Sequence, residues 1–135
     1  MTELTVSRTL DAPPERVWAA FTTAKGLAAW MWPESWQTTS EVDLRVGGRY
    51  RIASAVSGMA IVGEFVSLDE PSRIVQTWQW EGEVEETLVT VTIEPRGAGT
   101  TLTILHERFD AAAARNAHLQ GWNDCLDRLP AYLAQ

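Results

Sequence analysis

Residues 119–133 read LQGWNDCLDRLPAYL, with an apolar side chain at every third or fourth position: Leu119, Trp122, Leu126, Leu129 and Leu133. This spacing predicts a long amphipathic helix with one apolar stripe. Asp110 is expected to cap its start, just before a run of alanines. Gly121 is a poor helix former, so we expect it to allow a close approach by a sheet or a ligand. Pro130 is expected to kink or tighten the last turns.

Upstream of this helix the hydrophobic period changes to two, which is typical of half-buried strands. Pairs such as Gly47-Gly48 and Ser57-Gly58 give hairpin-like breaks between the strands. Short connections favour an antiparallel meander. The strands are expected at about residues 3–10, 36–46, 49–55, 59–68, 73–80, 84–94 and 100–107.

Two short helices are expected after the first strand. Pro14 suits a first helical turn, and the following residues place an apolar face on the helix. Lys25-Gly26 is expected to interrupt it, and a second helix over residues 27–31 is stopped by Pro33. The order of elements predicts an α+β fold in which a curved, seven-stranded antiparallel sheet grips the long C-terminal helix. A cavity remains between them wherever sheet and helix do not meet closely.

The composition limits the classes of partner. The length of 135 residues suits one domain, residues 1–135. The net charge of −7, with one lysine, argues against nucleic-acid binding and against docking on anionic membranes. No apolar run is long enough to span a membrane, and the first residues do not resemble a signal peptide. The single cysteine, Cys125, makes a reducing cytoplasm the expected location.

Seven tryptophans are more than so short a chain needs to fill a core. Trp18 and Trp122 belong to apolar helix stripes and are expected to pack in the core. Trp78 and Trp80 share one face of a strand. They line the cavity if that face is concave and form an exposed patch if it is convex. The remaining three rings are expected to close one end of the sheet-and-helix grip: Trp30, Trp32 and Trp36.

Residues with catalytic potential are few. His106 shares a strand face with Leu102 and Ile104, and it is a weak candidate for a general base. The alternative, a histidine with a purely structural role, is favoured. Two distant histidines make a poor metal site, so no metal and no cofactor is expected. Cys125 is expected to be a buried, inert thiol, because Asp124 and Asp127 flank it.

Two charged groups have a simpler interpretation as solvated surface. An arginine inside a cavity would anchor an anion, but we expect Arg49 and Arg51 to be solvated or paired with Glu41 and Glu64. Four acidic residues follow Trp80 around a hairpin tip, where we expect a solvated edge: Glu81, Glu83, Glu85 and Glu86.

Several segments resemble START-like (SRPBCC) proteins. These are residues 12–22, APPERVWAAFT, residues 27–33, LAAWMWP, and residues 121–129, GWNDCLDRL. Residues 43–50, DLRVGGRY, resemble the arginine and paired-glycine hairpin of the branch named for homology to the activator of heat-shock protein 90 ATPase. Residues 63–65 and 71–78 continue the match. The resemblance implies the helix-grip fold. Related folds bind lipids, sterols and plant hormones, cyclise polyketides, or serve as enzyme subunits.

The preferred hypothesis is binding of a small hydrophobic or amphipathic molecule between the sheet and the C-terminal helix. The expected ligand-binding residues are Trp32, Trp36, Tyr50, Met59, Trp78, Trp80, His106, Trp122 and Cys125. One alternative is an interaction module that activates a chaperone ATPase. A chaperone partner is not expected, because a separate N-terminal domain supplies much of that contact in the co-chaperone. Another alternative is a cyclase- or hydrolase-like enzyme that uses His106. The residues do not decide whether the chain forms a homodimer.

Overall fold

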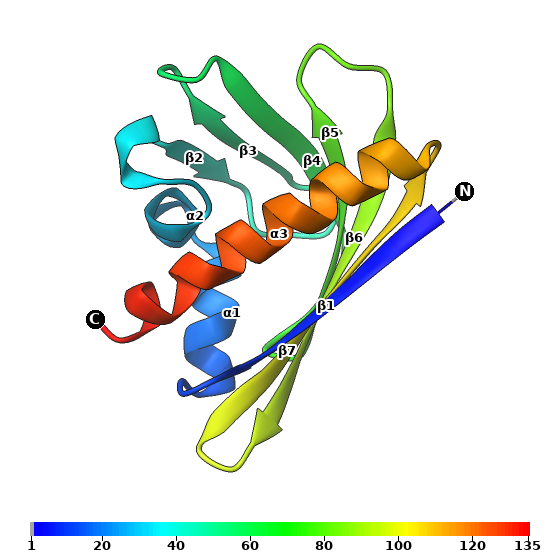
Figure 1. Ribbon diagram of the computed structural model, residues 1–135. Helices are drawn as coiled ribbons and strands as arrows, with labels where there is room; N and C mark the ends of the chain where they lie inside the picture. Colours follow the sequence, from blue (N-terminus) through cyan, green and yellow to red (C-terminus); the bar gives the residue numbers. More distant parts are fainter. Residues whose placement is uncertain (1) are drawn as a thin grey trace.

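The computed structural model describes residues 2–135, and within them seven strands form one antiparallel sheet in the order β1-β7-β6-β5-β4-β3-β2 (Figure 1). Strand β1 pairs with β7 because the chain returns to it at the end, while the other neighbours are joined by hairpins. The strands are β1 (Thr2–Leu10), β2 (Thr39–Val42), β3 (Arg49–Ser54), β4 (Met59–Asp69), β5 (Arg73–Trp80), β6 (Glu86–Arg96) and β7 (Gly99–Phe109).

The apolar alternation of each strand points one row of side chains at the helices. On β7, Leu102, Ile104 and His106 are fully buried, while Thr101 and Thr103 on the opposite face are half-buried. The same period places buried Leu4 and Val6 on β1. These rows form a continuous core with the apolar faces of the helices.

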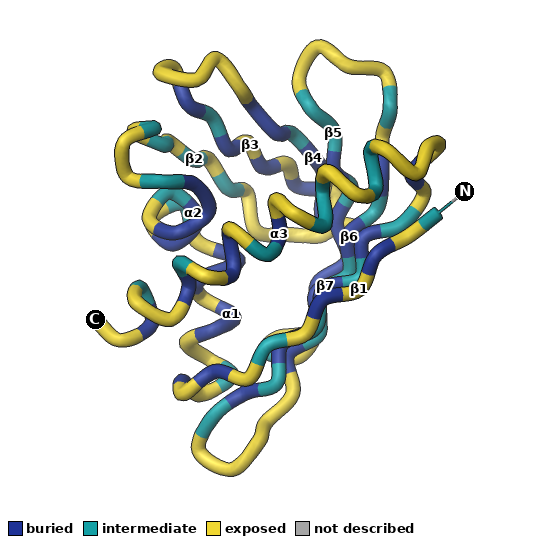
Figure 2. The backbone as a smooth tube through the Cα atoms, in the orientation of Figure 1, coloured by how far each residue is buried: buried dark blue, intermediate teal, exposed yellow. Residues whose placement is uncertain are grey.

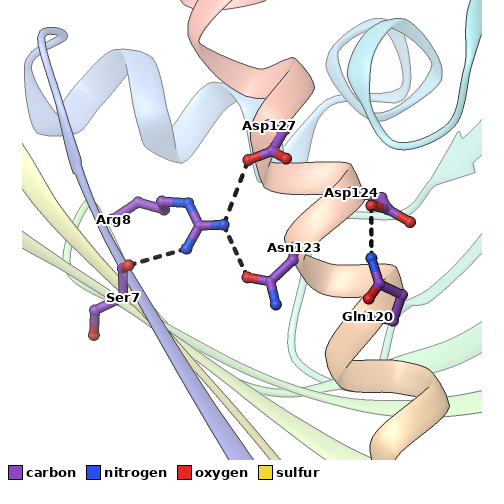
Figure 3. A network of polar contacts seen from close by, with 6 residues as sticks. All are labelled: Ser7, Arg8, Gln120, Asn123, Asp124 and Asp127. Atoms are coloured by element: carbon purple, nitrogen blue, oxygen red, sulfur yellow. Dashed lines mark hydrogen bonds and ion pairs between the residues drawn. The ribbon is translucent and has the colours of Figure 1, made fainter.

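Helix α3 (Ala112–Leu133) lies across this face of the sheet (Figure 1). Its buried residues follow the stripe seen in the sequence, and Figure 2 shows them alternating with exposed ones along the helix. Arg8 of β1 links the first strand to α3. Its Nη2 donates to Asn123 Oδ1 over 2.9 Å and forms an ion pair with Asp127 Oδ1 at 3.5 Å (Figure 3). The helix-grip α+β fold is therefore confirmed.

The two short helices are α1 (Pro14–Thr22) and α2 (Ala24–Trp30). The prediction that Lys25-Gly26 interrupts the helix was wrong, because the break lies at Thr23. The Thr23 hydroxyl accepts from Gly26 N over 3.0 Å and so caps α2. A Cβ at Gly26 would lie 2.7 Å from that hydroxyl. The glycine therefore serves close packing.

The predicted strand over residues 36–46 was too long at both ends. Trp36 belongs to a 3-10 helix, η1 (Glu34–Trp36), and Gln37 then takes a left-handed conformation with φ of 49°. After β2, the chain turns between Asp43 and Gly48, where Gly48 N donates to Arg45 O. Trp36 therefore lies on η1 and not on β2.

The start of α3 also differs from the prediction. Asp110 does not cap the helix: the N-cap is Ala111, which has no side-chain hydrogen bond. The backbone N–H of Asp110 instead donates to Glu85 Oε2 over 2.9 Å. This contact holds the end of β7 against the β5–β6 hairpin. The helix continues through Pro130 to Leu133.

Candidate ligand-binding cavity

A cavity of about 670 Å³ lies between the sheet and α3. Its walls come from the end of α2 and η1, from the β3–β4 and β5–β6 hairpins, and from residues 114–128 of α3. This volume falls in the usual range of about 300–1,000 Å³ for small-molecule sites. Gly121 borders the cavity, and a Cβ there would meet nothing within 4 Å. Of the two expected neighbours of Gly121, the sheet was wrong, because no sheet atom in residues 2–135 lies within 4 Å of that Cβ; a close approach by a ligand stays a prediction.

Five tryptophan rings, from the sheet, from α3 and from the segment around η1, border the cavity, and we call this set the aromatic wall: Trp32, Trp36, Trp78, Trp80 and Trp122. The ring centroids of Trp32 and Trp80 lie 6.2 Å apart in near-parallel planes. Trp78 meets Trp80 edge-on at 6.1 Å and tilts against Trp122 at 5.3 Å. Such offset and edge-to-face contacts are the favourable arrangements for aromatic pairs.

The face of β5 that carries Trp78 and Trp80 points toward α3. Trp80 Nε1–H donates to His118 Nε2 over 2.8 Å, and the His118 Nδ1–H donates to Ala114 O over 2.7 Å. Both rings therefore border the cavity, and the exposed-patch alternative is excluded. Trp78 is 5% exposed, and its Nε1 has no hydrogen-bond partner within residues 2–135.

His106 lies beneath the aromatic wall and does not line the cavity. Trp122 Nε1–H donates to its Nδ1 over 3.0 Å, so the ring proton sits on Nε2 and is donated to Thr87 Oγ1 over 2.7 Å. The Thr87 hydroxyl donates in turn to Trp78 O. Burial lowers the pKa of His106 to about 3, with a smaller electrostatic contribution from the neighbouring His118 ring. Both ring nitrogens are occupied, as in a structural histidine.

Of the other expected site residues, two border the cavity and one does not. Met59 and Cys125 border the cavity, and burial raises the pKa of the Cys125 thiol to about 11, which leaves it protonated and unreactive at neutral pH. Tyr50 lies outside the cavity lining, in the core against Phe65. Its hydroxyl donates to Thr77 O over 2.5 Å.

Four carboxylates also border the cavity, and three of them were expected at a solvated hairpin edge: Glu81, Glu83 and Glu85. We call all four the acidic rim: Glu81, Glu83, Glu85 and Asp124. Glu81 forms a two-contact ion pair with Arg51 at 2.9 and 3.0 Å, which lowers the pKa of Glu81. Arg51 is therefore paired at the surface, but with Glu81 rather than with Glu41 or Glu64. In the sequence, the three glutamates of the acidic rim occupy positions 81, 83 and 85, directly after Trp80. Their closeness to a tryptophan expected to bind a ligand could have indicated that they border the cavity.

Two further lining residues were missed by sequence reasoning. His118 precedes Trp122 by four residues, so helical spacing alone places it on the same face. Arg128 donates from Nε to Trp30 O over 3.1 Å and from Nη2 to Met31 O over 2.7 Å. It thus binds the last carbonyls of α2, a favourable position for a cation.

Other kinds of site are not seen in the part of the chain that the structure describes. No group of three or more His, Cys, Asp or Glu side chains in residues 2–135 is arranged to hold a metal ion. None of the helices described there is both long and apolar enough to cross a membrane.

Comparisons with known proteins agree with this architecture. A solved structure of protein CV1439 from Chromobacterium violaceum is 30% identical, with a TM-score of 0.85, covering 98% of this chain and 97% of that chain. PFC0360w from Plasmodium falciparum, described as an HSP90 activator, is 25% identical with a TM-score of 0.82, covering 99% and 97%. An uncharacterized protein from Rhizobium leguminosarum is 25% identical with a TM-score of 0.85, covering 98% and 94%.

A comparison with curated proteins gives no match. The family model described as "Activator of Hsp90 ATPase homolog 1-like protein" matches residues 11–134, which include every helix and all strands after β1. The chain therefore belongs to the family of Activator of Hsp90 ATPase homolog 1-like proteins.

Proposed function

We propose that the protein binds a small hydrophobic or amphipathic molecule in the cavity between the sheet and α3. The observation that carries the proposal is the aromatic wall, five tryptophans that border one cavity of about 670 Å³. Apolar concavities with a few polar groups are the usual ligand sites of proteins. The lining also holds a buried donor without a partner within residues 2–135, Trp78 Nε1, which would donate to an oxygen of a ligand.

Gly121 gives this proposal a sharp test. Gly121 borders the cavity and a Cβ there meets no atom within 4 Å, so we expect the ring of Gly121→Phe to occupy part of the cavity. Ala113→Phe is the matched control, because Ala113 is exposed on the same helix and does not border the cavity. A library of lipids and apolar metabolites is screened by tryptophan fluorescence and thermal shift.

The expected result is a ligand that quenches fluorescence and raises the Tm of the wild type and of Ala113→Phe. Gly121→Phe is expected to lose both responses. Failure of every library member to change either signal would count against the proposal. So would a ligand that binds Gly121→Phe as tightly as the wild type, because it would occupy another surface.

A second candidate is an interaction module that stimulates a chaperone ATPase. The observation that favours it is the likeness to the Plasmodium falciparum protein described as an HSP90 activator, 25% identical over 99% of this chain. The direct test adds the purified protein to a heat-shock protein 90 and measures ATP hydrolysis. A several-fold stimulation that Gly121→Phe retains would support this role as separate from the cavity. An unchanged ATPase rate over a wide concentration range would exclude it.

A further inference from the structure

The charge around the cavity is strongly one-sided. The lining holds four carboxylates, in the acidic rim, and one guanidinium, that of Arg128. Of the four carboxylates, only Glu81 forms an ion pair within residues 2–135, with Arg51 at the surface. Arg8 lies on the other flank of α3 from Asp124, as Figure 3 shows, and binds Asn123 and Asp127 instead. The opening of the cavity therefore carries an excess of negative charge.

The cationic and N–H groups of the lining are largely occupied by the protein itself. Two nitrogens of Arg128 hold the end of α2. The indole N–H groups of Trp80 and Trp122 donate to histidine nitrogens. An anionic head group would thus meet carboxylates and few free donors, and bringing like charges together is unfavourable.

The aromatic wall favours the opposite charge. The face of a tryptophan ring is negative and attracts ammonium groups within about 6 Å of its centre, most strongly when water is excluded. Trp36 and Trp80 are the half-buried members of the wall, so their rings lie where a head group would enter. Trp78 also borders the cavity, and its buried N–H has no acceptor within residues 2–135, so a ligand oxygen that reached it would satisfy this donor.

From these contacts we propose that the ligand is a cationic amphiphile. Its apolar body packs against the aromatic wall, an oxygen atom accepts from Trp78, and an ammonium group lies between the half-buried rings of Trp36 and Trp80 and the acidic rim. This inference rests on the proposed binding function and adds the chemical class of the ligand.

Three octanamides that share tail and amide oxygen test the head group alone. Their amide nitrogens carry a 3-(trimethylammonio)propyl group, its uncharged 4,4-dimethylpentyl isostere, or a 3-carboxypropyl group. Affinities are measured by calorimetry and tryptophan fluorescence at low salt. The cation is expected to bind roughly tenfold tighter than the neutral isostere and the anion weakest, given the sizes of cation–π and charge interactions at a partly exposed site.

Two matched double variants separate the acidic rim from the net charge of the protein. Glu83→Gln with Asp124→Asn removes two rim charges that form no ion pair within residues 2–135. Glu70→Gln with Glu94→Gln removes two exposed charges that do not border the cavity. The rim variant is expected to bind the cation several-fold more weakly and the isostere equally. The control variant is expected to bind both like the wild type.

The outcomes distinguish the two proposals. If the isostere or the anion binds as tightly as the cation, and Gly121→Phe abolishes that binding, the cationic class is wrong and the cavity function stands. If no octanamide and no library member binds, both are wrong. If the cation still binds Gly121→Phe, it associates with the acidic surface, and the cationic class is again overturned.

Discussion

His106 shows how one buried residue can be polar, titratable and structural at once. Its two nitrogens join α3, β7 and β6 through Trp122 and Thr87. A protonated ring could not accept the Trp122 N–H, because Nδ1 would then be a second donor. The neutral form is therefore the one that the fold requires, and this sets how stability depends on pH.

Acid is expected to unfold the protein partly through this residue. The pKa of His106 is lowered from 6.5 to about 3, so between these values the unfolded chain binds a proton that the folded chain does not. Stability is then fully present above about pH 6.5 and is lost as the pH falls toward 3, by up to a few kcal/mol. Urea unfolding of wild type and His106→Gln between pH 7 and 4 measures the slopes.

His106→Gln is expected to be less stable at pH 7 by about 1–3 kcal/mol, because its partners lose their hydrogen bonds, and to show a flatter dependence on pH. His118→Gln serves as the comparison: it removes the smaller, electrostatic contribution of His118 and keeps the burial of His106, so most of the dependence on pH is expected to remain. An unchanged slope in His106→Gln would mean that His106 is not held neutral in the folded protein.

Gly121 lies in a helix interior, where glycine is normally avoided. It has no positive φ, and a Cβ at this position would meet no atom within 4 Å, so neither backbone strain nor packing requires glycine here. Gly121→Ala is expected to stabilise the protein by about 0.5–1 kcal/mol, the usual gain of alanine in a helix interior. Urea unfolding checks this, with Gly26→Ala as the contrast: it is expected to destabilise, because Thr23 and Ala19 crowd that site.

At the scale of elements, the contact between α2 and α3 forms the end of the cavity beside Trp32. Arg128 makes this contact through the carbonyls of Trp30 and Met31. These residues end α2, where carbonyls lack helical partners. The position of Trp32 relative to α3 therefore depends on an arginine that makes no ion pair within residues 2–135.

Arg128→Met is expected to cost about 1–3 kcal/mol of unfolding free energy, because two charge-assisted hydrogen bonds are lost in a half-buried place. Arg16→Met is the control and is expected to change stability by less than about 0.5 kcal/mol, because Arg16 is exposed and makes one long contact, of 3.4 Å. Urea unfolding measures both. Equal effects in the two variants would contradict the role given to Arg128.

The elements that were predicted best from the sequence are those whose apolar residues recur at regular spacing. The alternation in β5 and the stripe of α3 each follow from one buried face. The strand predicted over residues 36–46 was too long because Trp36 and Val42 are both apolar and fit one pattern. The left-handed backbone of Gln37 separates them. The predicted helix cap at Asp110 was wrong, and the backbone N–H of Asp110 donates to Glu85, a residue 25 positions away. Local pattern carries no information on such distant contacts.

At the scale of the whole molecule, the same limit applies to the cavity. Periodicity placed Trp78 and Trp80 on one strand face and Trp122 on one helix stripe, but it left open whether the face of Trp78 and Trp80 is the one that borders the cavity. The acidic rim could not be assigned to the cavity, because Glu83, which follows β5, and Asp124, on α3, lie far apart in the sequence and border the same cavity only in the folded chain. His106 shares the inward face of the sheet, but the tryptophans cover it, which periodicity alone does not show.

The chain is expected to unfold as one cooperative unit, residues 1–135. The stripe of α3 is buried only against the sheet and the short helices, so neither layer keeps its apolar face covered without the other. The seven tryptophans lie on α1, α2, η1, β5, α3 and the segment between α2 and η1. Their fluorescence therefore reports on both layers, whereas circular dichroism reports on backbone structure.

Urea unfolding followed by the two signals is expected to give one coincident transition, with an m-value of about 1–3 kcal/mol/M as for other small domains. If the fluorescence and circular dichroism transitions of Arg128→Met also coincide, the protein unfolds cooperatively even when the contact between α2 and α3 is weakened. A fluorescence transition that precedes the loss of circular dichroism would show that the helices leave the sheet separately. The cavity would then open by local unfolding, and ligand entry would be expected to follow the rate of that step.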